Sequence, residues 1–389
     1  MSKDLELKVN VLPVTTYNFL HVNEGSLEIK DFDITVKNFG EPEEIPAGIT
    51  LNKGVSFQDA GRIFRDYSDR ILSLKKEAVS PNGETADRDK NQVVRTGMGA
   101  DIDALMSDMG VTCDIYTAEE GVKVDKPLIL RYNMESGDTA LAGNVIHARK
   151  NSEVTVIMVC NSDRDARGFI GVSTRLFAED VARINLFKIQ TLGDGFVHFD
   201  DIGGSCLLGG RISLTELELG GREVYASAYV TLSEKESVFE SNMGYLSRQD
   251  HRLDMNFVAD QRGRKTDAAM HFKGVLMDNA AKVLRGTLDF KTGSSGSVGD
   301  EQEDVLLLSP DVINRTMPII LCQEEDVEGR HGATIGQLGD DILFYMQTRG
   351  IDEESAKRIM IKARLESVAR DIPDFDIRQK VLYYIQNIV

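Results

Sequence analysis

Apolar and polar residues alternate along most of the middle of the chain. From about residue 120, short apolar segments follow one another, separated by glycines or charged turns. The run Arg211–Leu219 (RISLTELEL) shows this alternation clearly, and a period of two is typical of a β-strand. Strands are predicted from Leu128–Tyr132 onward, ending with Val305–Leu308 and Pro318–Leu321, and no helical pattern interrupts them.

Two all-β folds are compatible with such a series of strands. A sandwich or closed barrel needs tight hairpin turns, such as Asn-Gly or Asp-Gly, at many joints. Those turns are scarce here, apart from Gly193-Asp-Gly195. A parallel β-helix, or solenoid, stacks its strands into rungs joined by irregular corners, and the placement of the glycines favours this fold. The chain is therefore predicted to be mainly β.

Helical patterns flank the strands on the N-terminal side. Apolar residues recur at helical spacing from Phe57 to Leu74, which predicts an amphipathic helix over residues 57–78. Residues 80–91 (SPNGETADRDKN) predict a polar loop, and residues 101–109 predict a second, short helix. Residues 1–120 are accordingly assigned to an N-terminal mixed or helical region.

The C-terminal residues also show helical patterns. A first helix is predicted to begin at Asp340 and to end at Gly350, because glycine takes a positive φ there at little cost. A second helix opens at Asp352, and Pro373 separates it from a third. The apolar face of the second is predicted to comprise Ala356, Ile359, Met360, Ala363 and Ser367, and that of the third Ile377, Val381, Tyr384, Ile385 and Ile388.

A glycine-rich segment, residues 328–338 (EGRHGATIGQL), joins the strands to these helices. We interpret it as a turn that carries one histidine, with Thr334–Gln337 in the form of a helix capping box. This interpretation divides the rest of the chain into a β-helix core over residues 121–330 and a C-terminal helical domain over residues 331–389.

Charge and cysteine content narrow the function. The 389 residues carry a net charge of −18, which disfavours binding to nucleic acid or to an anionic membrane surface. The four cysteines are far apart in sequence, and no apolar run is long enough to span a bilayer. The N-terminus has no signal-peptide pattern, so the expected location is the reducing cytoplasm.

Few residues offer chemistry of their own. The chain has no Walker-type phosphate loop and no G-x-S-x-G or H-E-x-x-H signature. His331 follows a run of carboxylates (Glu324, Glu325, Asp326 and Glu328) and can bind iron or another metal, or simply shape a turn. Cys322 can ligate iron or accept sulfur as a thiolate, or serve as a small buried apolar residue.

Several segments together resemble one known family, over roughly residues 200–385. They are Gly263–Phe290 (GRKTDAAMHFKGVLMDNAAKVLRGTLDF), Asp304–Ser309 (DVLLLS), His331–Leu338 (HGATIGQL) and Leu343–Ile351 (LFYMQTRGI). In this order they resemble the SufB/SufD family of the SUF iron–sulfur cluster assembly system. The His-Gly-Ala-Thr sequence is more similar to the SufD branch.

This resemblance implies a right-handed parallel β-helix and a scaffold subunit without enzyme activity. It implies a SufB-like partner, or self-pairing when the chain is isolated, and a SufC-like ATPase on the C-terminal domain. The expected partner-binding residues are Leu343, Phe344, Tyr345, Arg349 and Gly350.

The resemblance also implies where cluster chemistry takes place. No tightly bound cofactor is expected, but an iron–sulfur cluster or iron is expected to reside transiently at the subunit interface. His331 matches a SufD histidine implicated there. The SufB cysteine that accepts sulfur would fall near Glu303 or Asp304, where this chain has none, so a SufB-like subunit is expected to supply the thiol.

Two other functions remain open on the residues alone. One is a carbohydrate-active enzyme with a groove on a β-helix, which would carry several carboxylates along that groove. The other is a structural adaptor without metal chemistry.

Overall fold

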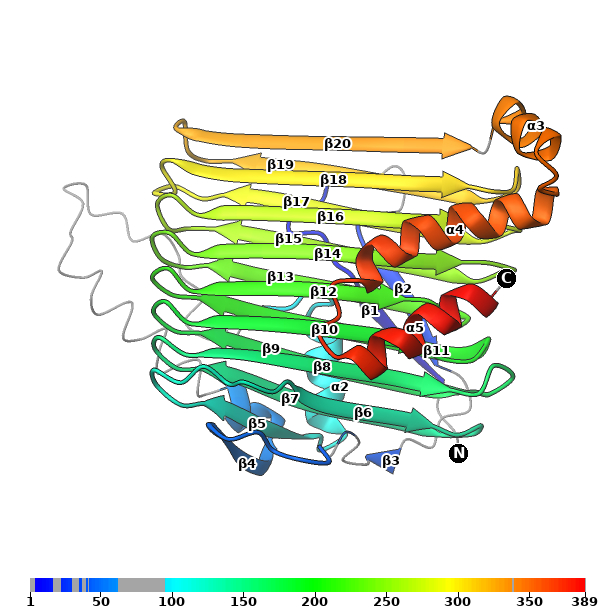
Figure 1. Ribbon diagram of the computed structural model, residues 1–389. Helices are drawn as coiled ribbons and strands as arrows, with labels where there is room; N and C mark the ends of the chain where they lie inside the picture. The colour runs from blue at the N-terminus through cyan, green and yellow to red at the C-terminus, as the bar shows by residue number, and fades with distance from the viewer. Residues whose placement is uncertain are drawn as a thin grey trace.

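The middle of the chain coils as a β-solenoid built from two long sheets that face each other (Figure 1). The computed structural model describes residues 4–16, 22–29, 35–36, 40, 42–61, 95–337 and 339–388. Successive strands alternate between the two sheets, and every pairing among β5 to β20 is parallel. The predicted parallel solenoid is thus confirmed, and the hairpin-built sandwich is excluded for this region.

From β5 onward, even-numbered strands form one sheet and odd-numbered strands form the other. The eight-stranded sheet contains β6 (Leu128–Met134), β8 (Glu153–Ser162), β10 (Arg183–Thr191), β12 (Arg211–Glu218), β14 (Val238–Ser247), β16 (Asp267–Leu276), β18 (Ser297–Leu307) and β20 (Val327–Gln337). The ten-stranded sheet contains β3 (Thr35–Val36), β4 (Ile49–Ser56), β5 (Thr112–Ala118), β7 (Thr139–Ala148), β9 (Arg167–Ala178), β11 (Gly195–Cys206), β13 (Glu223–Leu232), β15 (Arg252–Gln261), β17 (Ala281–Phe290) and β19 (Ile313–Cys322).

The solenoid core lies between the sheets and is filled by every second residue of each strand. Parallel pairing places equivalent residues beside one another, as with Ile184, Ile212 and Phe239 on three neighbouring strands. All three are buried in one continuous apolar cluster. Apolar burial of this kind stabilises by about 25 cal/mol for each Å² removed from water.

The repeat is carried by the backbone more than by the side chains. Equivalent corners of successive rungs contain Asn151, Val181, Gly209, Glu236 and Lys265, all with φ between 54° and 61°. Only one of these residues is glycine, although this left-handed conformation disfavours most other residues. The rungs therefore repeat in shape without an exact sequence repeat.

The N-terminal region covers the outer face of the ten-stranded sheet. The antiparallel pair β1 (Leu5–Val9) and β2 (Gly25–Ile29) packs there with α2 (Ala100–Asp108). The predicted short helix is confirmed as α2. The predicted helix over residues 57–78 is helical at 57–61, and its remainder, like the predicted loop at 80–91, lies outside the described residues.

The first strands close one end of the solenoid. Strand β4 runs antiparallel to β5, with a register shift between Asn52 and Val55 and an exposed Lys53 at its centre. On the other sheet, Glu43 forms an ion pair with Arg131 of β6 at 3.7 Å. A bulge and a charged residue on an edge strand both oppose pairing with another chain.

Three helices follow the last strand: α3 (Asp340–Thr348), α4 (Glu353–Ala369) and α5 (Phe375–Asn387). Helices α4 and α5 fold back over the outer face of the eight-stranded sheet (Figure 1). The side chains of Asp352 and Asp374 cap them by accepting hydrogen bonds from backbone N–H groups.

The predicted face of α4 is wrong in part. Ile359 is 46 % exposed, whereas Ile361, Leu365 and Val368 pack into the apolar cluster on the sheet. The helix carries apolar residues on more than one side, and contact with the sheet decides which side is buried. The predicted start of α3 at Asp340 and the positive φ of Gly350, 82°, are confirmed.

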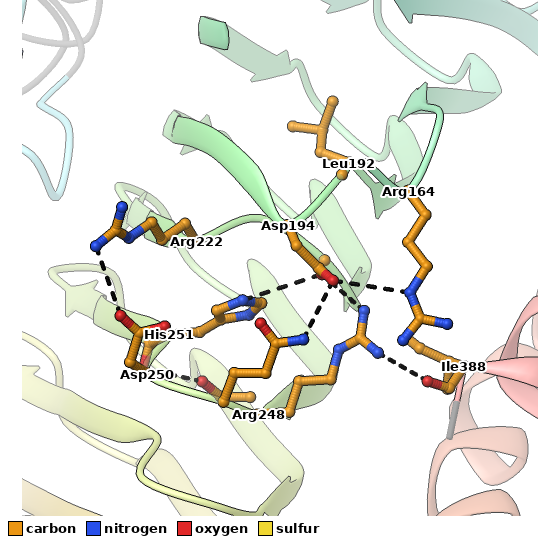
Figure 2. Close-up of polar contacts among 12 residues, drawn as sticks. Arg164, Leu192, Asp194, Arg222, Arg248, Asp250, His251 and Ile388 are labelled. Atoms are coloured by element: carbon orange, nitrogen blue, oxygen red, sulfur yellow. Dashed lines mark hydrogen bonds and ion pairs between the residues drawn. The ribbon is translucent and has the colours of Figure 1, made fainter. Parts of the chain in front are cut away.

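One buried arginine fixes the end of α5 to the solenoid (Figure 2). Arg248 donates to the backbone oxygen of Ile388 at 2.8 Å and to Asp194 Oδ1 at 2.7 Å. Asp194 also accepts from Gln249 at 3.3 Å and forms an ion pair with Arg164 at 3.7 Å. The C-terminal helix is therefore tied to the corner between β14 and β15, which is tied in turn to the corner between β10 and β11, two rungs away.

The predicted turn at residues 328–338 is wrong. Residues 327–337 form strand β20, so the β-structure extends beyond residue 330. Thr334–Gln337 lies within this strand and does not cap a helix, and Gly339 is the N-cap residue of α3, without a side-chain bond. Ladder bonds to β18 organise this glycine-rich segment. No helix in the described part of the chain combines the length and apolarity that crossing a bilayer would require.

Candidate functional site

The last rung leaves the solenoid open at the end that carries β19 and β20. In the described part of the chain, β20 pairs only with β18, and β19 pairs only with β17. None of the residues of β20 is fully buried. Each strand therefore presents one edge of unpaired backbone groups, which is a template for another β-strand.

His331 lies on β20 with its side chain toward the solenoid interior. It pairs with Glu301 in the parallel ladder, and paired residues point to the same face. A Cβ on Gly329, two residues earlier, would touch Phe290 and Ile320 at 3.1 and 3.3 Å, so this face is the inner one. Because no further rung covers it, His331 remains exposed. His331 therefore stands over Glu301 at the open end.

A buried polar group lies beneath His331. Glu303 accepts hydrogen bonds from Tyr245 at 2.9 Å and from Thr316 at 2.5 Å, and it forms an ion pair with Lys282. Lys282 also donates to Thr316 at 3.0 Å. These residues come from both sheets, so the interior of the final rungs contains a polar group of its own.

Glu301 is the least satisfied member of this group. Its Oε2 atom has no hydrogen-bond partner within the chain. Burial, and then the neighbouring Glu303, raise the pKa of Glu301 to about 8. Gly286 makes room for it, because a Cβ at that position would lie 2.1 Å from Glu301 Oε1. Both polar side-chain atoms of Asn314 also lack a partner, which leaves three such atoms near the open end.

The structure does not join His331 and Cys322 into one site. Cys322 is the last residue of β19, is exposed, and donates from Sγ to the oxygen of Glu324 at 3.0 Å. Among the described residues, no hydrogen bond or ion pair links it to His331. The one group of three close candidate metal ligands in this part of the chain is His198, Asp200 and Glu218, deep inside the solenoid. Of the two alternatives for Cys322, the small buried apolar residue is wrong, because the side chain is exposed.

Helix α3 carries a second exposed surface. Ile342, Phe344 and Tyr345 are 50, 68 and 59 % exposed. Arg349 lies over the Tyr345 ring, with its guanidinium carbon 5.3 Å from the ring centroid. Leu343 is half-buried, and Gly350 ends the helix. In Figure 1 this helix projects past the end of β20, beside the start of α4. Clustered exposed apolar residues of this kind mark sites of protein contact.

Comparison with known proteins gives the family. The profile described as SUF system FeS cluster assembly, SufBD core domain, matches residues 131–364. The chain belongs to the SufBD family. The matched SufBD core comprises nearly all of the solenoid, the open end, α3 and most of α4.

Individual SufBD relatives indicate the branch. The iron–sulfur cluster assembly protein SufD of Bacillus subtilis is 23 % identical over 381 residues, which cover 92 % of this chain and 80 % of that protein. SufD of Escherichia coli is 23 % identical, over 68 % of this chain and 64 % of its own length. A SufBD family protein of Pyrococcus horikoshii is 27 % identical, over 66 % and 57 %. The chain is thus SufD-like.

Sequence reasoning missed most of the polar group at the open end of this SufBD core. Lys282, Glu301, Glu303 and Thr316 were not singled out, because they lie on three different strands and carry no motif. One signal was present: Gly299, Glu301, Glu303 and Val305 are spaced two residues apart, which places all four on the inner face once β18 is recognised as a strand.

Proposed function

We propose that this chain is a non-catalytic, SufD-like scaffold subunit for iron–sulfur cluster assembly. It pairs through its open solenoid end with a SufB-like subunit and contributes His331 to the site where the nascent cluster forms. The cluster is the cargo of this complex. The observation that carries the proposal is the position of His331. It is exposed on the inner face of β20, the last strand of its sheet, whose second edge pairs with no other strand in the described part of the chain.

The unsatisfied polar atoms at this end support the pairing. Glu301 and Asn314 bury three atoms without a hydrogen-bond partner in the chain. Such atoms cost about 1–3 kcal/mol each unless a partner or water satisfies them. A second β-helix stacked on β19 and β20 would bring donors and acceptors to this rung and pair both strand edges. His331 would then lie inside the combined assembly, where the partner supplies the thiol.

The exposed residues of α3 support an ATPase as the third component. Hydrolysis in an attached motor biases a complex only through contacts that differ between its two states. A helix that projects beyond the solenoid and is connected to it through α4 can receive such motion. The proposed contact residues are Leu343, Phe344, Tyr345, Arg349 and Gly350.

Substitution of His331 tests the central claim. The chain is co-expressed with SufB-like and SufC-like subunits, as wild type, His331→Ala, or His271→Ala as a matched control on β16. We expect His331→Ala to assemble the complex but to lose most of its cluster absorbance and iron content, and His271→Ala to retain both. Normal cluster formation in an assembled His331→Ala complex would exclude the proposed role of His331. An adaptor without metal chemistry predicts no iron in any of the three complexes.

A further inference from the structure

A second polar cluster lies inside the solenoid, several rungs from the open end. His198 and Asp200 come from β11, and Glu218 comes from β12 on the facing sheet. Each is 2 % exposed. One potential ligand atom from each residue lies within 4.8 Å of those of the other two. Three ligand-type side chains thus converge from two sheets on one enclosed point.

His198 is held as a metal-binding histidine commonly is. Its Nδ1 lies 2.8 Å from the backbone oxygen of Ile170, which can only accept a hydrogen bond. Nδ1 therefore carries the proton, and Nε2 keeps its lone pair. A backbone carbonyl that fixes the tautomer in this way is the usual outer contact of a histidine ligand. Burial lowers the pKa of His198, which keeps the ring neutral near pH 7.

The carboxylate oxygens around this point outnumber the hydrogen-bond donors that the chain offers them. Glu216 Oε1 and Oε2 and Glu218 Oε2 have no hydrogen-bond partner, although both side chains are buried. Lys188 forms an ion pair with Asp200 Oδ1. When all are ionised, the three carboxylates and one ammonium group leave two negative charges inside the solenoid. A buried charge of this size requires a counter-charge or protonation.

The space between these residues fits a small guest. A cavity of about 10 Å³ is lined by His198, Asp200, Glu218, Lys188 and Cys160, among others. That is near the lower limit for one water molecule. The competing state without a guest is a pair of glutamates that remain neutral or share a proton.

We propose that His198, Asp200 and Glu218 bind one divalent first-row transition-metal ion inside the solenoid. One imidazole nitrogen with carboxylate oxygens suits Zn²⁺, Mn²⁺ or Fe²⁺ better than Mg²⁺ or Ca²⁺, which prefer oxygen ligands alone. The ion's two positive charges balance the two excess negative charges, with Glu216 as the uncoordinated carboxylate beside it. The site is separate from His331 and does not depend on the proposed role in cluster assembly.

Metal content of the full, untagged chain tests the proposal. Because the cluster is enclosed, the chain is unfolded with chelator, refolded with stoichiometric Zn²⁺, passed over a desalting column and analysed by mass spectrometry for metals. We expect about one ion per chain in the wild type and in His331→Ala and Cys322→Ser. We expect at least a tenfold loss in Glu218→Gln, which has nearly the same shape, and in His198→Asn, which can still donate to Ile170.

Thermal melting of the same samples provides the second reading. Zn²⁺ should raise the midpoint temperature of unfolding of the wild type and leave that of Glu218→Gln unchanged. X-ray absorption of the loaded wild type should show nitrogen and oxygen scatterers and no sulfur at about 2.3 Å. A metal-free wild type after refolding, metal retained in Glu218→Gln, or a sulfur ligand would each overturn the proposal. If both variants fail to fold, the wild-type metal content and absorption spectrum still decide.

Discussion

At the scale of single residues, the polar interior of the final rungs sets the character of the open end. Glu301 and Glu303 occupy positions that carry apolar side chains in most other rungs. Glu303 is satisfied by Lys282, Thr316 and Tyr245, whereas Glu301 relies on protonation. The open end is therefore held together by hydrogen bonds and charge.

Glu301 should make stability depend on pH. Its pKa is about 8 in the folded chain against an ordinary value of 4.5, so between these values the folded state keeps a proton that the unfolded state has lost. The free energy of unfolding should fall as pH rises through this window, by about 1.4 kcal/mol for each tenfold difference in proton affinity. Glu301→Gln, which stays neutral, should lose this part of the fall.

The measurement is urea unfolding at a series of pH values for the wild type, Glu301→Gln and Glu240→Gln. Glu240 is an exposed control on β14. The difference between wild type and Glu301→Gln should grow in favour of the variant up to about pH 8. Parallel curves for these two proteins would show that Glu301 does not hold a proton in the folded chain.

At the scale of elements, the two outer faces of the solenoid are covered by different parts of the chain. The N-terminal region lies on the ten-stranded sheet, and α4 and α5 lie on the eight-stranded sheet. Buried arginines reinforce both covers: Arg285 donates to the oxygen of Val22 at 2.7 Å, and Arg248 donates to Ile388. Next to the open end, α3 keeps an exposed apolar surface.

The packing of α4 can be tested by paired truncations. Leu365 is fully buried against the sheet, whereas Ile359 on the same helix is 46 % exposed. Leu365→Ala should lower the free energy of unfolding by about 2–5 kcal/mol, because it leaves a cavity. Ile359→Ala should cost less than about 1 kcal/mol by the same chemical denaturation. Equal losses would mean that the other face of α4 packs on the solenoid.

The exposed surface of α3 should be needed for the ATPase. Phe344→Glu and Tyr345→Glu place charges where apolar contact is proposed, so co-purification of the SufC-like subunit should fall at least tenfold. Tyr383→Glu on α5, an aromatic residue that is 70 % exposed, is the control and should retain it. Retention of the ATPase by both α3 variants would require another docking surface.

How far the sequence predicts this structure depends on which side chains each strand buries. Strands such as β12 were recognised because apolar and polar residues alternate along them. The start of β18 was not, since its inner positions include Glu301 and Glu303. Strand β20 was mistaken for a turn because it has no buried face, so its glycines and charged residues show no alternation.

Which site residues could be identified from the sequence also depends on whether their signal is local. His331 was identified through its local sequence. The cluster of His198, Asp200 and Glu218 was not, because its members meet only when two sheets face each other. Glu216 and Glu218 sit at the inner positions of Arg211–Leu219, and that placement could have drawn attention to them.

At the scale of the whole molecule, the open end of the solenoid favours self-association, whereas the net charge opposes it. If the isolated chain pairs with a second copy through its open end, each copy brings a net charge of −18 to the contact. Salt screens such repulsion, with a Debye length of about 10 Å at 0.1 M. The dimer fraction of the isolated chain should therefore rise with ionic strength in sedimentation equilibrium.

A charge on β20 should weaken this dimer at any salt concentration. Ile335 is 54 % exposed on β20, and Val181 is 53 % exposed at a distant corner. Ile335→Glu should shift the chain toward monomer, whereas Val181→Glu should not. A dimer that is insensitive to Ile335→Glu would place the contact elsewhere.

The difference between the two ends of the solenoid limits how many copies can join. A stack of rungs with both ends exposed would add subunits without limit and grow into fibrils. Here the antiparallel β4, with its irregular register and exposed Lys53, opposes strand pairing at one terminus, whereas at the other β19 and β20 each have an unpaired edge in the described part of the chain. If two copies meet head to head through that end, the contact uses both of these strand edges on each copy, and assembly is expected to stop at two subunits.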